Sequence, residues 1–441
     1  MNETDDLFLR SDGDDDAFIA KLADVAAQYD MSAHGGRRLT CHLMLQSNRA
    51  LRMLQTCDFC DAVRQKLDVY PFTQDELWCQ TIVPDYESIT LQSDKHVHVV
   101  VFGMGEVAEM VAIQQSHIAH FPNYVRNHSL RTRITMIDSE ATLKYEDFIN
   151  RYQHLFDNSY YRVVKPSEAK AVVKFHKPMY EGSREDFVDV EWEFVEAEFE
   201  NADLREKLKL WANDKHQLLT VVLTANDRNQ NQSRSLLLPQ ALYEQHIPVF
   251  VYGQNVFDSD AISPYIRMAK NVNYIYSQCY NENVENWTGQ LRYAVEIDVE
   301  ERERLWAKLP IVKRMSSIYN AMTIPVKMRS VGLNEEDWDK FYDLSPQDIE
   351  LLAQVEHNRW CVEELILGFR PCTDAEQDEI AADVAAHKEA YKAHKVHYDL
   401  RAYNDLRPDK TGKSVTVYDL CLSSCLPLIA KEEMKEKGGE Q

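Results

Sequence analysis

Apolar and polar positions from Lys95 onward form blocks that predict strands and helices in turn. The β-branched run His96–Phe102 precedes a glycine turn, and the apolar residues of Glu106–Ala119 then recur at helical spacing. Further strands are predicted at Arg131–Asp138, Val188–Val195, Leu218–Thr224, Pro248–Tyr252 and Val272–Ile275, with helices at Ala202–Asn213 and Ser233–Gln245. Strands that alternate with helices pair in parallel through right-handed crossovers. The pattern therefore predicts an α/β fold with a doubly wound, Rossmann-like parallel sheet.

The segments on either side of these blocks have a different pattern. Residues 1–94 show no clean period, and we interpret them as a mostly helical region with an acidic tail and a helix around Ala17–Tyr29. Ser139–Phe187 is too long for a simple crossover and predicts an excursion from the core. Beyond residue 298 the pattern predicts helices at Glu300–Leu309, Ser345–Leu367 and Asp374–His397, and a short extended piece at Val415–Tyr418.

These changes in pattern divide the chain into four parts. We expect an N-terminal region at 1–94, a nucleotide-binding domain at 95–298, a mainly α-helical domain with its lead-in at 299–430, and a disordered tail at 431–441. About three domains suit a chain of 441 residues.

Charge and composition narrow the function. The formal net charge of −23 disfavours a nonspecific nucleic-acid binder, because the field of the whole molecule repels a polyanion. No apolar stretch is long enough to span a membrane, and the N-terminus lacks the features of a signal peptide. Nine cysteines without a secretory signal favour reduced thiols. We therefore expect a soluble cytoplasmic protein without nucleic-acid partners.

The sharpest motif is G-x-G-x-x-A at Gly103–Ala108, between a predicted strand and a predicted helix. The first glycine allows a tight turn, the second lets the backbone approach a pyrophosphate, and the helix N-terminus offers unpaired N–H groups. Asp138 ends the next strand, where a carboxylate would accept hydrogen bonds from a ribose. Gly103, Met104, Gly105, Glu106 and Asp138 are thus candidate nucleotide-binding residues. The alternative is a fold that keeps its glycines for packing around an empty crevice.

This segment resembles the TrkA-N, or RCK, domain of the potassium-uptake regulatory family. The resemblance extends over Leu218–Tyr252, which is similar to that family's fourth strand, polar turn, helix and P-V-x-V strand. It implies that Asn226 and Asp227 lie beside the crevice and that NAD or another adenine nucleotide binds there. The family's Gly-Asp-Ala turn after the third strand is replaced here by Val195–Ala197, so the adenine contacts of the family do not carry over to these positions.

The C-terminal part resembles the RyR domain, which is named from ryanodine receptors and also occurs in bacterial proteins. The resemblance rests on Glu356–Trp360 (EHNRW), Gly368–Arg370 (GFR), His397–Leu400 (HYDL), Tyr403, Leu406 and Tyr418-Asp419, and on a lead-in containing Asn320, Ile324–Lys327 and Gly332. The order of the two domains matches that of bacterial TrkA-N–RyR proteins. The resemblance implies a second ligand site or a domain that transmits the nucleotide signal.

The residues themselves leave two interpretations of this motif open. His357 and Trp360 share a helix face, and Trp360 with Arg359 could sandwich a purine. Alternatively, Trp360 belongs to the core and Arg359 pairs with a carboxylate such as Asp399 or Asp419. The candidate ligand residues of this domain are His357, Arg359, Trp360, His397, Tyr403 and Asp419.

Several local patterns are weak mimics of active sites. Cys57–Cys60 looks like a redox motif, but a helix-like segment replaces the strand that should precede it. Asp409–Ser414 mimics two phosphate motifs without their context. His387, His394 and His397 lack further metal ligands at suitable spacing. We predict no metal site and no catalytic residue.

The sequence therefore favours a regulatory sensor over an enzyme. A small-molecule nucleotide would bind the Rossmann-like domain, and the RyR-like domain would bind a second ligand or pass the signal to an unidentified protein partner. Homodimerisation is common among the relatives that the resemblance implies. An NAD-dependent oxidoreductase and a ligand-free interaction scaffold are the alternatives.

Overall fold

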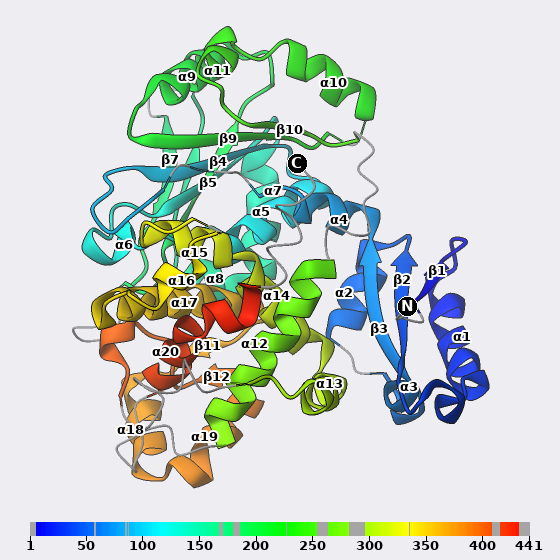
Figure 1. Ribbon diagram of the computed structural model, residues 1–441. Coiled ribbons are helices and arrows are strands. Elements are labelled where there is room, and N and C mark those ends of the chain that lie inside the picture. The colour runs from blue at the N-terminus through cyan, green and yellow to red at the C-terminus, as the bar shows by residue number, and fades with distance from the viewer. Residues whose placement is uncertain are drawn as a thin grey trace.

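The computed structural model describes residues 6–56, 59–83, 86, 88–166, 171–179, 186–225, 227–253, 263–281, 296–334, 336–407 and 415–431. It has a mixed α/β fold in which a large, mostly parallel sheet lies above a group of helices, with a smaller sheet at one side (Figure 1). Among the described residues, no helix is both long and apolar enough to cross a membrane.

The large sheet has seven strands in the order β10-β9-β4-β5-β8-β6-β7. The bounds of its first five strands are β10 Val249–Val251, β9 Gln217–Leu223, β4 His96–Phe102, β5 Thr132–Asp138 and β8 Val190–Glu196. All of their pairings are parallel. These five strands confirm the parallel sheet that the sequence predicts. From β4 the chain builds the sheet first toward β5 and β8, and then returns to add β9 and β10 on the other side.

The segment predicted as an excursion from the core extends the sheet instead. It contains α7 (Ala141–Arg151), α8 (Gln153–Asp157), β6 (Tyr160–Val164) and β7 (Val172–His176). Strand β6 pairs in parallel with β8, and β7 pairs with β6 as an antiparallel edge strand. The sixth predicted strand, Val272–Ile275, is wrong, because it lies inside a long helix.

Helices cover both faces of the large sheet (Figure 1). One face packs against α9 (Ala202–Asn213) and α11 (Gln240–Glu244), and the other against α5 (Glu106–Ile118), α7 and α8. The helix predicted at Ser233–Gln245 is interrupted near Pro239, so that α10 (Arg228–Leu236) and α11 are separate. Proline lacks the N–H that a continuous helix would need there.

The N-terminal region contains a second parallel sheet, which the sequence did not predict. Its strands are β1 (Asp6–Arg10), β2 (Leu39–Leu45) and β3 (Leu67–Thr73), paired in the order β1-β2-β3. Around them lie α1 Asp15–Gln28, η1 Met31–His34, α2 Asn48–Thr56, α3 Asp61–Lys66 and α4 Gln74–Gln80. Polar residues and a proline inside β3 hide its strand pattern, and β1 lies in the segment predicted as an acidic tail.

The C-terminal part is mainly helical, as predicted. Its longest helices are α12 (Ser263–Asn281), α14 (Ile311–Met322) and α17 (Pro346–Ile366). The smaller elements are α13 Val299–Lys308, α15 Ile324–Ser330, α16 Trp338–Phe341, β11 Arg370–Pro371, α18 Asp374–Ala382, α19 Val384–Ala393, β12 Val396–His397, η5 Tyr403–Asp405 and α20 Thr416–Ser424.

Two local predictions for this part are wrong. The extended piece expected at Val415–Tyr418 belongs instead to the start of α20, and the single helix expected at Asp374–His397 is two helices followed by β12. Asp383 caps α19, which marks the break between the two helices. Helix α12 lies ahead of the boundary expected at residue 298, but it packs with α14 and α20.

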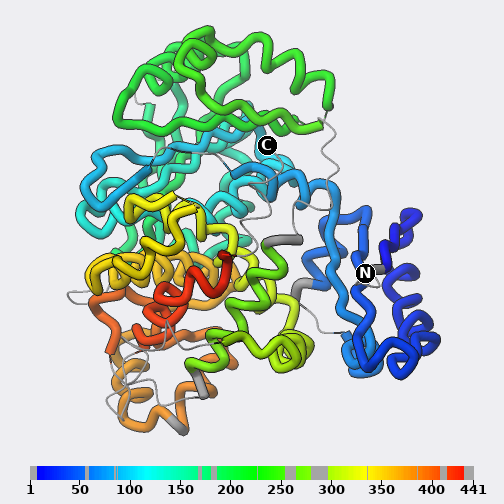
Figure 2. Tube along the Cα trace, viewed as in Figure 1, coloured from blue at the N-terminus to red at the C-terminus, as the bar shows by residue number. Residues whose placement is uncertain are grey.

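Helix α17 joins the helical part to the large sheet. It begins at a capping box formed by Ser345 and Asp348, and it packs against α5 and α8. Cys361, Val362 and Leu365 of α17 belong to the same apolar core as one face of the sheet. The trace in Figure 2 shows the helices from α12 onward beneath the sheet and the N-terminal sheet beside both.

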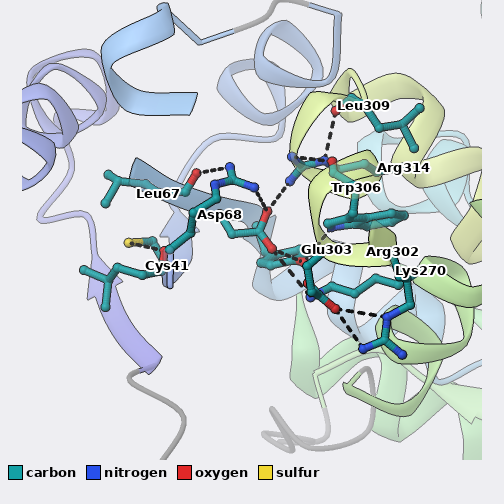
Figure 3. A network of polar contacts seen from close by, with 12 residues as sticks. Cys41, Leu67, Asp68, Lys270, Arg302, Glu303, Trp306, Leu309 and Arg314 are labelled. Carbon is teal, nitrogen blue, oxygen red and sulfur yellow. Dashed lines mark hydrogen bonds and ion pairs between the residues drawn. The ribbon is translucent and has the colours of Figure 1, made fainter. Parts of the chain in front are cut away.

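A buried ion network fixes the N-terminal region to the helices (Figure 3). The Asp68 carboxylate on β3 lies 2.7 Å from the Arg314 guanidinium of α14 and 3.7 Å from Lys270 Nζ of α12. Tyr70 donates a hydrogen bond to Asp68 at 2.7 Å. Burial raises the pKa of Asp68, but the cations outweigh it and hold the pKa below its usual range. The N-terminal region, the large sheet and the helical part are therefore joined by buried contacts.

Candidate functional site

The glycine turn after β4 lies at the carboxyl edge of the large sheet. Gly103 has a φ of +125°, and its N–H donates to the Ile137 carbonyl oxygen at 2.7 Å. A Cβ on Gly103 would lie 3.0 Å from Thr224 Oγ1 at the end of β9 and 3.7 Å from the Cβ of Ala108. Only glycine therefore suits both the backbone conformation and the close approach of β4, β9 and α5.

Helix α5 begins immediately after this turn, without a capping side chain. Gly105 is its N-cap residue, with an extended backbone (φ −83°, ψ −177°) that other residues can also adopt. The N–H groups of the first turn have no partners within a helix, and they carry the positive end of the helix dipole. This end of α5 can therefore accept an anionic group.

Acidic side chains in the first turn of α5 are neutralised by two arginines. Arg52 of α2 lies 2.9 Å from Glu106 Oε1 and 3.2 Å from Glu109 Oε1. Arg151 of α7 forms a second ion pair with Glu109, and the Tyr152 hydroxyl donates to Glu109 at 3.0 Å. These contacts direct the acidic charge of the turn toward α2 and α7. Glu106 thus lies at the predicted site, in an ion pair with Arg52.

Asp138 lies beside the glycine turn, as the motif predicts. Its Oδ2 accepts a hydrogen bond from the Met104 N–H at 3.1 Å, and its Oδ1 accepts from the Glu140 N–H at 2.9 Å. Lys144 Nζ lies 2.9 Å from the same Oδ1. Because each carboxylate oxygen can accept two hydrogen bonds, Oδ2 keeps capacity for a further donor.

The loop after β9 lies at the same carboxyl edge of the large sheet. Asn226 lies outside the described residues, and Asp227 caps α10 by accepting from the Asn229 N–H at 2.9 Å. Asn231, which is fully buried, exchanges hydrogen bonds of 2.8 and 2.7 Å with the backbone of Ala225 and so holds the loop. No sequence motif indicated Asn231, whose only signal is an amide inside a polar run.

Arg228 is a further residue that no sequence motif indicated. Its side chain lies over Gly253 at the end of β10, where an added Cβ would come within 2.4 Å of Arg228 Cγ. Gly253 has a φ of +98°. Arg228 is exposed, so it places a cation at the same edge as the uncapped start of α5. The Tyr252 hydroxyl donates to Asp75 of α4 at 2.6 Å, which brings the N-terminal region to this edge.

Five of the six candidate ligand residues of the helical part come together around α17. His357 Nδ1 lies 3.2 Å from Asp419 Oδ2, and the His357 ring contacts the rings of Trp360 and Tyr403 at 5.6 and 5.7 Å. The rings of Trp360 and His397 meet edge to face at 4.9 Å. These contacts join α17 to β12, η5 and α20.

Arg359 points to a different cluster. Its guanidinium lies 2.9 Å from Glu356 and 2.6 Å from Glu363, and Lys327 Nζ lies 2.6 Å from Glu356. The Arg359 side chain is only 2% exposed. Of the two interpretations of Arg359, the structure shows the ion pair, but with Glu356 and Glu363 rather than with Asp399 or Asp419.

One arrangement on α17 is similar to a cysteine-nucleophile triad, although no sequence motif indicated it. In it, the His357 ring lies between the Cys361 thiol and the Asp419 carboxylate. The Cys361 Sγ is 3.4 Å from His357 Nε2, but that nitrogen is closer to the Arg401 carbonyl oxygen, at 2.9 Å. Burial lowers the pKa of His357, while Cys361 and Asp419 raise it by more, so the net pKa is raised. The Nε2 atom is thus directed to the Arg401 carbonyl oxygen rather than to the thiol. Cys361 is also fully buried, so we assign this arrangement a structural role.

Among the described residues, no group of three His, Cys, Asp or Glu side chains could hold a metal ion. Some of the weak motifs lie outside the described residues. These are both phosphate-motif mimics, within residues 408–414, and the first half of the redox-like motif, Cys57 and Asp58. No protein-family model, curated protein or solved structure matches the chain. Its function must therefore be inferred from the geometry of its own residues.

Proposed function

We propose that the chain is a nucleotide-binding sensor whose carboxyl-edge crevice takes NAD or a related adenine nucleotide. The observation that carries the proposal is the uncapped start of α5 directly behind a glycine turn, with Gly103 at a φ of +125°. When β6 and β7 are left out of the count, the order β8-β5-β4-β9-β10 reads 3-2-1-4-5, which is similar to the first five strands of the Rossmann order 3-2-1-4-5-6, and the glycine turn follows strand 1, where that order reverses. Ligands of such sheets bind at this place.

Each residue of the crevice has a distinct part in this proposal. The backbone at Met104 and Gly105 approaches the pyrophosphate, and the first turn of α5 supplies N–H donors to it. Arg228 adds a cation from the neighbouring loop, where charge-assisted hydrogen bonds to phosphate would be strong. The free capacity of Asp138 Oδ2 accepts a ribose hydroxyl. Asn226 and Asp227 flank the nucleotide, as the TrkA-N resemblance implies.

The sensor part of the proposal rests on α5 and its neighbours. The N-terminus of α5 lies at the carboxyl edge of the sheet, and the body of the same helix packs against α14 and α17 of the helical part. A ligand that changes the position of α5 would therefore act directly on the RyR-like helices. An oxidoreductase would need a general acid or base beside the nicotinamide, and the described crevice residues suggest none.

Isothermal titration calorimetry of the full chain with NAD, NADP, ADP-ribose and ATP tests the proposal. The change Gly105→Val should weaken binding of the best ligand at least tenfold, about 1.4 kcal/mol, because the side chain would occupy the space of the pyrophosphate. The melting temperature should hold, because the backbone at Gly105 suits any residue. NADP should bind less tightly than NAD, since its 2′-phosphate would meet Asp138.

A matched control adds a β-branched side chain to the first turn of another helix. Ala375→Val changes an exposed position near the start of α18 and should leave nucleotide binding unchanged. Equal affinities of the wild type and Gly105→Val would remove the glycine turn from the site. Reduction of NAD with any of a panel of alcohols and hydroxy acids, abolished by Gly105→Val, would favour the oxidoreductase.

A further inference from the structure

The two parallel sheets have four outer edges, and β1 forms the least protected of them. Proteins commonly protect a sheet edge with a short strand, a bulge, a lysine or a proline. In the large sheet, β10 has only three residues, and β7 contains Lys174 and a shift in its register with β6. In the small sheet, β3 contains Pro71. Strand β1 pairs with β2 in unbroken register over five residues and contains none of these features.

The outer backbone groups of β1 are available for pairing. The strand lies at the outer margin of the molecule (Figure 1). Neighbouring residues of a strand direct their N–H and C=O groups to opposite sides. The Ser11 N–H donates to the Met44 carbonyl oxygen of β2 at 2.9 Å, so the odd-numbered residues of β1 bond to β2. The even-numbered residues, Phe8 among them, direct their backbone groups outward, where they have no backbone partner among the described residues.

Both faces of β1 are apolar at its centre. Phe8 is 56% exposed, and its ring stacks on the His42 ring of β2, with centroids 4.4 Å apart and an angle of 9°. The His42 ring lies 5.7 Å from the Tyr70 ring of β3, so the three rings form a ladder that ends at the free edge. On the other face, Leu7 and Leu9 are half-buried against the apolar core that α1 and α2 cover.

A second copy of the chain fits this edge through a two-fold axis. Two identical edges related by such an axis present the same residues to each other, and their strands pair antiparallel. An axis at Phe8 sets this residue opposite itself and sets Leu7 opposite Leu9 of the second copy. The outward N–H and C=O groups of Phe8 then exchange two hydrogen bonds across the axis. The strand is therefore complementary to itself in its backbone and in its apolar side chains.

The same register places opposite charges together. Arg10 is exposed at the end of β1, and this pairing sets it opposite position 6 of the second copy, which is an aspartate in the sequence. Opposite charges across a strand pair stabilise it, whereas like charges destabilise it. An antiparallel copy of β7 centred on Lys174 would instead set two lysines opposite each other. Charge therefore favours self-pairing at β1 and disfavours it at β7.

We propose that two copies of the chain associate through β1, which joins their small sheets into one six-stranded sheet with two antiparallel β1 strands at its centre. The ring ladder continues from one Phe8 to the other, and the leucines extend the apolar core on the opposite face. Interfaces that bury less than about 1,200 Å² are weak, and a pair of five-residue strands belongs to that class. The dimer is therefore a weak one. This inference does not depend on the proposed function.

Sedimentation velocity of the full chain tests the proposal. The weight-average mass should rise from that of one chain toward that of two as the concentration increases from about 1 to about 300 µM, as expected of a weak interface. Phe8→Lys sets two like charges opposite each other at the axis and should weaken association at least tenfold. Because Phe8 is largely exposed, the melting temperature of this variant should stay close to that of the wild type.

Two controls separate this edge from other effects. Phe175→Lys makes the same change at a phenylalanine of β7 that is 61% exposed, and it should leave association unchanged. Gly105→Val should also leave association unchanged, so that a failure of the nucleotide site and a failure of this proposal are distinguishable.

Two charge variants test the register of the pair. Arg10→Glu sets two acidic residues opposite each other, and Asp6→Arg sets two arginines opposite each other, so each variant alone should associate severalfold less than the wild type. An equimolar mixture of the two variants restores opposite charges at both ends of the strand pair. The mixture should therefore regain the association of the wild type.

Three results would each overturn the proposal. They are a mass of one chain at every concentration, equal association of the wild type and Phe8→Lys, and a mixture that associates no better than the separate charge variants. If Phe8→Lys does not fold, the mixture of charge variants decides between support and rejection by itself.

Discussion

The glycine turn before α5 and the motif on α17 both contain residue types that are typical of ligand sites, but the protein uses them differently. At the turn, the available groups are backbone N–H groups of a helix start that no side chain caps. On α17, the charged side chains of Glu356 and Arg359 are almost completely buried, and both have partners inside the protein. The start of α5 therefore has no side-chain cap, whereas the charged groups on α17 have partners within the protein.

The difference teaches which polar groups indicate a binding site. A buried ion network is tolerated only when every member has a partner, and such a network then orders the helices that contribute to it. Lys327, Glu356, Arg359 and Glu363 connect α15 to α17 in this way. Groups without a partner in the described part of the chain, such as the first turn of α5 or the outer backbone groups of β1, are the better guide to ligands and partners.

The largest expected effect concerns the buried ion network on α17. Arg359→Ala would leave Glu356 and Glu363 buried with one cation fewer, and it should lower the free energy of unfolding by about 3–5 kcal/mol. Urea denaturation measures this loss. Arg407→Ala, at an exposed arginine that lies 3.9 Å from the Asp378 carboxylate, is the control and should change little. A loss below about 1 kcal/mol in Arg359→Ala would contradict a structural role.

The next effect concerns pH and the ring cluster beside α17. Burial lowers the pKa of His397 to about 4, and its Nδ1 accepts a hydrogen bond from the Asp399 N–H at 3.2 Å. The unfolded chain binds this proton near pH 6.5, so stability should fall as the pH decreases from about 6.5 to about 4, by up to about 3 kcal/mol.

The dependence should be smaller in His397→Gln, which has no proton to gain. His394→Gln, at an exposed position, serves as the control and should keep the wild-type dependence. Identical curves for the wild type and His397→Gln between pH 6.5 and 4 would assign the loss to other groups.

A third prediction compares two glycines in the left-handed region. Gly103→Ala combines a φ of +125° with a contact of 3.0 Å to Thr224 Oγ1, and it should cost about 2–3 kcal/mol of stability. Gly332 has a φ of +79° and open space around it, so Gly332→Ala should cost only about 1 kcal/mol. Chemical denaturation of both variants gives the difference, and equal losses would mean that the contact with Thr224 contributes nothing.

The smallest effect concerns the charges around the crevice. Lys144 is 40% exposed and pairs with Asp138 and Glu140. Lys144→Met should therefore change the free energy of unfolding by no more than about 0.5 kcal/mol, because exposed ion pairs contribute little. A loss several times larger in urea denaturation would show that this edge is held together by side chains, as α17 is, and would weaken the contrast between the two regions.

The sequence by itself determined the central strands and the turn that follows β4. Continuous β-branched runs buried on both faces have few alternatives to a parallel strand, which is why His96–Phe102 was predicted with its observed bounds. A glycine with a positive φ and an aspartate at the end of the next strand also follow from local chemistry. The N-terminal sheet gave no such signal, because its strands mix polar and apolar positions and are held by partners distant in the sequence.

Only the tertiary structure decided the partners of the charged residues and the free edge of the small sheet. The letters EHNRW suit a ligand site and a buried ion network equally well. The outcome depended on two residues outside this motif, because Lys327 pairs with the Glu356 carboxylate and Glu363 pairs with the Arg359 guanidinium. Strand β1 is an edge because β2 pairs with it on one side and with β3 on the other, and these three strands lie far apart along the chain. Electrostatic and packing energies depend on distances in space, and a sequence pattern specifies such distances only within a single helix, strand or turn.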